Sequence, residues 1–257
     1  MKCIDMHLDT ITLEPSFSRG SSSLTTQGFR KMDAQQDLQS LRLSLLDMSK
    51  LSQRAVDYAT KGYRLGSPEF CRYVRRGDHQ LGELRRNITN LCQRPLPHGL
   101  SHSEALMDES AVDAELRFPQ AALRICDALH ATSTASAEIA HHTMLLLEDA
   151  DWVPGCEALE KVCYLVNRLM CLCIVSLFKR ESQHAEAVLQ NNDAVRLIER
   201  ALRELRSESR RQNAIPAALE LAITNSLKQI TRQTNEIAEA IVFWLQNRRY
   251  APSIVRR

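Results

Sequence analysis

The residues with the clearest potential for chemistry lie on one short stretch of the chain. Glu138 and His141 are three positions apart, the Glu-x-x-His spacing that di-iron proteins use on a bundle helix. His130 and Thr134 precede them at four-residue steps and His142 follows, so in a helix these side chains share or flank one face. Because carboxylate and imidazole groups together bind iron, zinc or manganese, this stretch is a candidate metal site.

A di-iron centre needs more than one such pair, because glutamates from two further helices must point at the same place. The other Glu-x-x-His in the chain, Glu181 to His184, falls at an expected helix start and not in mid-bundle. The sequence has no Ser/His/Asp order, glycine-rich phosphate loop or G-x-G-x-x-G. We therefore expect no catalytic residue and no cofactor. One alternative is a metal site with His130, Glu138 and His141 as candidate ligands, and another is a metal-dependent bundle enzyme that uses Glu138 and His141. Surface histidines are the simpler interpretation.

These residues belong to a segment that the chain repeats. The stretch from Leu123 to Ala140 recurs without a gap as Leu221 to Ala238. The identical pairs are Leu123/Leu221, Ile125/Ile223, Leu129/Leu227, Glu138/Glu236, Ile139/Ile237 and Ala140/Ala238. Each copy ends a helical pattern of about a hundred residues, the size of a small bundle. The repeat predicts an all-α protein of two tandem three-helix bundles.

The composition agrees with this class. With 257 residues and 44% hydrophobic residues the chain can bury a sizeable core, while eight glycines and eight prolines are too few for the turns of a sheet protein. The net charge of +2 does not call for a nucleic-acid partner. The arginine-rich stretch 196–211 also carries Glu199, Glu204 and Glu208, so we interpret it as a solvated helix face.

The pattern divides the chain into four parts. Residues 1–36 are rich in Ser and Thr and are expected to be a flexible arm, 37–150 the first repeat, 151–250 the second, and 251–257 a frayed basic tail. The first expected helix starts near Asp37 and ends at Gly62 or Gly66. The other helices are expected at about 67–92, 113–148, 156–180, 182–211 and 213–248, with a linker at 93–112.

The buried seams of the two long third helices are polar in the middle. The hydroxyl residues are Thr132, Ser136 and Thr143 in the first repeat and Thr224, Thr231 and Thr234 in the second. They could line a polar groove, but small hydroxyls that bond to their own helix are the simpler interpretation. Asp78 and Asp193 could be functional acids, and we interpret them as surface carboxylates that pair with nearby arginines.

The sequence points to the cytoplasm. Its start lacks the apolar core of a signal peptide. The most apolar window, Val162 to Phe178, contains Asn167, Arg168 and Ser176, so a buried helix explains it better than membrane insertion. The eight cysteines include no C-x-x-C pair, and we expect reduced thiols and no zinc site.

The order of these elements, and several residues within them, follow the pattern of a known protein family over about residues 37 to 247. The residues that carry the resemblance are Leu45-Leu46-Asp47-Met48, Leu51 and Ala55, then Val74, Asp78, Leu81 and Leu84, then Glu115-Leu116-Arg117-Phe118, Ala121 to Ile125 and Ile139-Ala140, and in the second half Leu189, Asp193, Leu197, Leu227, Ile230 and Glu236-Ile237-Ala238-Glu239. The shared pattern is a long helix, a second helix, a linker and a third helix ending in Ile-Ala, all duplicated. In this pattern the chain resembles the PhoU family of phosphate-uptake regulators.

The resemblance implies a function without catalysis. Members of the family are six-helix adaptors that link a phosphate-specific ABC transporter to a membrane sensor histidine kinase on its cytoplasmic side. The resemblance therefore implies a transporter ATPase and a histidine kinase as partners. We also expect a homodimer, because elongated bundles with long apolar seams often self-associate. A protein with the same fold and different partners is a further alternative.

One feature of the family is missing from this sequence. Many members carry Glu-x-x-x-Asp in each third helix, where the two carboxylates help to bind a metal cluster. Those positions fall here on His130 and Thr134 in the first repeat and on Lys228 and Arg232 in the second. Two cations repel a divalent ion, so we do not expect the family's metal site in this chain.

Overall fold

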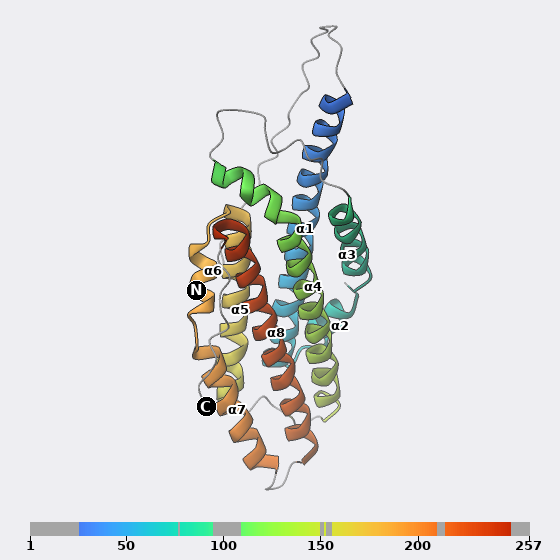
Figure 1. The fold of residues 1–257 in the computed structure, drawn as a ribbon. Coiled ribbons are helices and arrows are strands. Elements are labelled where there is room, and N and C mark those ends of the chain that lie inside the picture. The colour runs from blue at the N-terminus through green and yellow to red at the C-terminus, as the bar shows by residue number, and fades with distance from the viewer. Residues whose placement is uncertain are drawn as a thin grey trace.

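The protein is an elongated bundle of long helices (Figure 1). The structure is a computed structural model of the chain and describes residues 26–76, 78–94, 109–149, 152, 156–209 and 214–247. These residues form eight α-helices and no strand. The predicted all-α class is confirmed.

The helices repeat one plan. In order they are α1 (Thr26–Leu65), α2 (Pro68–Arg76), α3 (Asp78–Gln93), α4 (Glu109–Leu146), α5 (Glu157–Lys179), α6 (Gln183–Leu189), α7 (Asp193–Ser209) and α8 (Ala214–Gln246). A long helix, a divided second helix and a long third helix make up each half. The three-helix repeat predicted from the duplicated segment is confirmed in this form.

The second helix of each half was predicted as one piece, and this was wrong. In the first half, α2 and α3 are separate helices with Gly77, a weak helix former, between them in the sequence. In the second half, α7 starts anew after Asn191 and Asn192. The side-chain oxygen of Asn191 accepts the Asp193 backbone N–H at 3.0 Å, and the Asn192 carbonyl accepts the Arg196 N–H at 3.2 Å. Asparagines favour such helix starts over helix interiors.

Two helices begin earlier than predicted. α1 starts at Thr26, inside the expected flexible arm, and α4 starts at Glu109, inside the expected linker. The early part of α1, residues 26–36, lacks an apolar period but is rich in strong helix formers such as Gln, Arg, Lys, Met and Ala. The remainder of the arm, the remainder of the linker and the basic tail lie outside the described residues.

The end of α1 shows that its two glycines have different roles. Gly66 has a φ of 58°, the left-handed conformation that favours glycine at a helix C-terminus. Gly62 lies inside α1, where an added Cβ would approach the Sγ of Cys71 to 2.6 Å. Only Gly66 therefore ends the helix, and Gly62 lets α2 approach α1 closely.

The long helices α4 and α8 form the centre of the bundle. They make the most extensive contact of any helix pair in the described part of the chain, and they run in opposite directions (Figure 1). Two contacts mark this antiparallel register. They are the ion pair Arg124–Glu239, at 3.6 Å, and the tilted rings of Phe118 and Trp244, with centroids 4.7 Å apart. The duplicated segment thus meets its own copy across the middle of the molecule.

Both repeats contribute to each of two hydrophobic clusters. One contains Leu41 and Leu45 of α1 together with Ile241 and Trp244 of α8. The other contains Tyr63 of α1 with residues of α5, α7 and α8. The clusters follow one another along the bundle. Because each contains residues from both halves, neither belongs to a single repeat. The division of the chain into repeats at 37–150 and 151–250 stays a prediction.

The apolar helix α5 is the one described helix long and apolar enough to cross a membrane. It packs instead against α1, α7 and α8, and half of its most apolar window is buried. Cys163 and Cys173 of this helix are fully buried, and burial raises the pKa of the Cys163 thiol to about 12. These thiols pack as small apolar side chains, as the sequence predicts. None of the seven described cysteines forms a disulfide with another described residue.

A buried polar pair joins the end of α1 to the start of α8. The hydroxyl of Tyr63 donates a hydrogen bond to Oε1 of Glu220 at 2.8 Å, and both side chains are buried. Burial raises the pKa of Tyr63, and the neighbouring carboxylate of Glu220 raises it further. Tyr63 is therefore a permanent donor to a carboxylate in the core.

We expect Tyr63→Phe to lower the free energy of unfolding by about 1–3 kcal/mol, because Glu220 loses a donor in a buried position. Chemical denaturation followed by circular dichroism measures this difference. The matched control is Tyr73→Phe, which removes the hydroxyl of an exposed side chain and is expected to change little. Equal unfolding free energies for the wild type and Tyr63→Phe would show that the hydrogen bond is not stabilising.

Candidate functional site

The candidate metal ligands lie along α4 but do not gather into a site. His130 is half-buried, while Thr134, Glu138 and His141 are exposed. Oε2 of Glu138 accepts a hydrogen bond from the hydroxyl of Ser226 on α8 at 2.9 Å. Glu138 is thus part of the contact between α4 and α8. In the described part of the chain, no three His, Cys, Asp or Glu side chains are close enough to hold a metal ion.

The two adjacent histidines contact each other. The rings of His141 and His142 have centroids 5.5 Å apart. Burial lowers the pKa of His142, and the neighbouring His141 lowers it further, while Glu138 acts in the opposite direction. Neutral His142 is therefore favoured in the folded protein. The second Glu-x-x-His is not a site either, since Glu181 precedes α6 and is exposed.

The positions that match the family's carboxylates do not suit a metal cluster. The Thr134 hydroxyl donates to the backbone carbonyl of His130 at 3.2 Å, within its own helix. On α8, Lys228 and Arg232 are exposed, and Nε of Arg232 pairs with Glu236 at 3.2 Å. A hydroxyl bonded to its own helix and two cations offer no ligand set for a divalent ion.

The hydroxyl residues of the two seams are buried and bond to their own helices. Each donates to the carbonyl four residues earlier, at 2.8 or 2.9 Å, as Thr132 does to Ala128 and Thr231 to Leu227. The same bond is made by Ser136, Thr143, Thr224 and Thr234. The simpler interpretation is therefore confirmed, and the seams form no polar groove.

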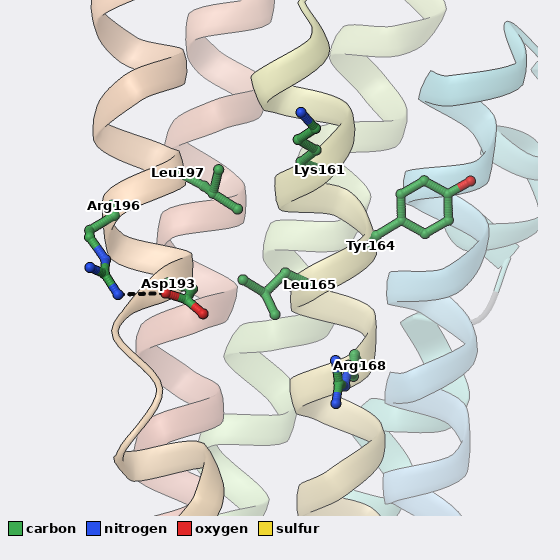
Figure 2. Close-up of a pocket in the computed structure, with 7 residues that line it drawn as sticks. All are labelled: Lys161, Tyr164, Leu165, Arg168, Asp193, Arg196 and Leu197. Atoms are coloured by element: carbon green, nitrogen blue, oxygen red, sulfur yellow. Dashed lines mark hydrogen bonds and ion pairs between the residues drawn. The ribbon is translucent and has the colours of Figure 1, made fainter. Parts of the chain in front are cut away.

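A hollow with a mixed polar and apolar lining lies between α5 and α7 (Figure 2). Its volume is about 490 Å³, and the residues that line it are Lys161, Tyr164, Leu165 and Arg168 of α5 and Asp193, Arg196 and Leu197 of α7. We call this the α5/α7 groove. Leu165 and Leu197 form its floor between the helices, and charged side chains stand around them (Figure 2).

Cations dominate the rim of the α5/α7 groove. Arg196 pairs with Asp193 at 2.6 Å, and Lys161 pairs with Glu157 at 2.5 Å. Arg168 is exposed and forms no ion pair with any described residue. The pairing predicted for Asp193 is confirmed, whereas the side chain of Asp78 lies outside the described residues. Among the described residues, no carboxylate thus pairs with the guanidinium of Arg168 beside the apolar floor.

The groove also touches the first repeat. Tyr164 points from α5 toward α1 (Figure 2), where the guanidinium of Arg64 lies 3.6 Å from the centre of its ring. Nη2 of Arg64 also donates to the Tyr164 hydroxyl. This stacking fixes one wall of the groove against α1.

Sequence reasoning missed this groove because it treated α5 only as a core helix. The available signal was the spacing of Lys161, Tyr164 and Arg168, which are three and four residues apart and form a polar stripe along an otherwise apolar helix. Such a stripe shows where the helix faces solvent, but the neighbouring helix that completes a groove cannot be read from it.

The lowered pKa of His142 makes stability depend on pH. As the pH falls, the unfolded chain binds a proton at this residue before the folded protein does, so the free energy of unfolding decreases. We expect the melting temperature to fall less in His142→Gln than in the wild type between about pH 7.5 and about pH 5.5. Differential scanning fluorimetry measures both slopes, and identical slopes would contradict this assignment.

We expect purified, tag-free protein to carry much less than one metal ion per chain. Plasma mass spectrometry measures the content of iron, zinc and manganese. The matched control is the triple variant Glu138→Ala, His141→Ala, His142→Ala, which should have the same content as the wild type. Near-stoichiometric metal that the variant loses would instead place a site on α4.

Comparison with known proteins agrees with the predicted fold. No protein-family model and no curated protein matches the chain. Two solved structures are similar to it. PhoU from Pseudomonas aeruginosa matches with a TM-score of 0.72 at 19% identity, over 83% of this chain and 99% of that one. The phosphate transport system regulatory protein PhoU from Streptococcus pneumoniae matches with a TM-score of 0.70 at 18% identity, over 85% and 99%. The resemblance to PhoU proteins is thus confirmed at the level of the fold.

Proposed function

We propose that this protein is a PhoU-like regulator of phosphate uptake and phosphate-responsive signalling. It acts in the cytoplasm as a non-catalytic adaptor between a phosphate ABC transporter and a sensor histidine kinase. One observation carries the proposal. This chain, including both of its repeats, matches nearly the whole length of two PhoU structures. A fold can host more than one function, so the surface of this chain must supply the rest of the argument.

The chemistry of the described residues favours binding over catalysis. The buried hydroxyls bond to their own helices, and the buried thiols have raised pKa values because of burial, as for Cys126 at about 12. A catalytic nucleophile needs the opposite, an accessible group with a lowered pKa. What the bundle offers instead is a set of broad helical faces.

The α5/α7 groove is the face we assign to a partner. Its apolar floor with a charged rim has the layout of a protein interface, in which a central apolar patch is surrounded by polar groups. An acidic segment of the partner suits this rim, where Arg168 has no ion-pair partner within the described part of the chain and Lys161 and Arg196 add positive charge. The partner in this proposal is the transporter ATPase or the cytoplasmic part of the kinase. The protein itself is proposed to be a homodimer.

We expect the purified protein to bind the transporter ATPase or the kinase cytoplasmic domain encoded in the same genome. Arg168→Glu should weaken that binding about tenfold or more, since it places a carboxylate against an acidic segment. Biolayer interferometry at two salt concentrations measures the effect, which should be larger at low salt.

Arg86→Glu is the matched control, because Arg86 is an exposed arginine on α3, away from the groove. It should bind as the wild type does. If neither partner binds, the adaptor proposal is wrong. If both partners bind Arg168→Glu normally, the adaptor proposal stands and the groove is not the contact surface. Deleting the gene should also change the rate of labelled-phosphate uptake in phosphate-rich medium.

A further inference from the structure

A second hollow lies at one end of the bundle, where α1, α4, α5 and α8 meet. Its volume is about 520 Å³, within the range of about 300–1,000 Å³ that is usual for ligand sites. Arg42, Leu43, Phe118, Phe178, Arg180 and Trp244 are on its walls. We call it the end pocket. It uses no residue of the α5/α7 groove.

The end pocket exposes apolar groups that the rest of the described chain does not cover. Leu43 is 57% exposed and Phe178 is 45% exposed. Trp244 is only 3% exposed, yet its indole Nε1 has no hydrogen-bond partner among the described residues. Buried N–H groups almost always have an acceptor. The surface that the pocket presents is therefore the apolar one of Leu43 and Phe178.

The charges around the end pocket are unbalanced toward positive. Arg42 and Arg180 both pair with one carboxylate, Glu115, the latter at 3.8 Å. Two guanidinium groups therefore share a single negative charge. A third cation, Lys50, lies nearby, with its Nζ 5.6 Å from the ring centre of Phe178. The carboxylate of Asp47 pairs with this lysine at 3.4 Å. A segment with apolar and acidic side chains would complement this surface.

The chain itself has such a segment, residues 3–14. Its sequence, CIDMHLDTITLE, contains three acidic residues and no Lys or Arg, and its apolar residues include Ile4, Leu8 and Ile11. The length of chain available is sufficient. Residues 15–25, about 11 residues, can span about 35 Å when extended. Leu43 is about 25 Å along α1 from its first residue, at about 1.5 Å per residue.

We propose that residues 3–14 dock in the end pocket of the same molecule. The apolar side chains of the segment cover Leu43 and Phe178, and its carboxylates pair with Arg42 and Arg180. This contact concerns the isolated chain, so it stands or falls independently of any phosphate-signalling partner.

Hydrogen exchange of the full-length protein, followed by mass spectrometry of peptides that cover residues 3–14, tests the proposal. Amides of this segment should exchange about tenfold or more slowly in the wild type than in Leu43→Glu, which puts a carboxylate in the pocket. Leu65→Glu is the matched control, because Leu65 is another exposed leucine of α1, at the C-terminal end of the helix and outside the end pocket. It should leave the protection unchanged. Circular dichroism checks that both variants are folded.

The charge contribution has its own test. The double variant Asp5→Lys, Asp9→Lys should lose protection in the same segment. Equal exchange in the wild type and Leu43→Glu would overturn the proposal, as would equal loss in Leu65→Glu. Protection that disappears when the protein is diluted about a hundredfold would also overturn it, because the segment would then be docking in a second copy of the chain.

Discussion

The packing of α4 against α8 is the constraint on which the rest of the bundle depends. The two helices are long and antiparallel, and both carry many small buried side chains, such as Ala128 and Ala135 on α4 and Ala238 and Ala240 on α8. Small side chains let helix axes approach closely, and the distance between axes follows from the residues at the contact. Buried hydroxyls are tolerated in these seams because they bond to the carbonyl one turn earlier. The remaining helices pack around this central pair.

Much of this arrangement could be predicted from the sequence, because long helices with a repeated apolar period leave a strong pattern. The duplicated segment, the seam hydroxyls and the pairing of Asp193 were all correctly interpreted. Helix ends were harder to predict. The break between α6 and α7 depends on two asparagines, and each of these residues is only weakly unfavourable within a helix. The start of α1 depends on the helix propensity of its residues. Because these residues have no apolar period, the hydrophobic pattern could not reveal that they are helical.

The two hollows were beyond the reach of the sequence for a different reason. Each is formed by residues of helices that are distant in the chain, such as Leu43, Phe178 and Trp244 in the end pocket. The hydrophobic pattern of one helix shows which of its residues face solvent. The helix that forms the other wall of the hollow is placed by tertiary packing, which that pattern does not show. The same limit applies to the α4 histidines. Their spacing suggested a metal site, yet the side chain of Glu138 contacts Ser226 on α8, a partner that no local pattern reveals.

The shared core has a consequence for the history of such a chain. Each hydrophobic cluster contains residues from both halves, and the central contact joins one copy of the duplicated segment to the other. A polypeptide of half this length could bury the same helix face only by pairing with an identical chain through its third helix, as a symmetric dimer. Gene fusion then turns an association between two molecules into an intramolecular one. In a single chain the two halves can differ in sequence, as His130 and Lys228 at matching positions illustrate.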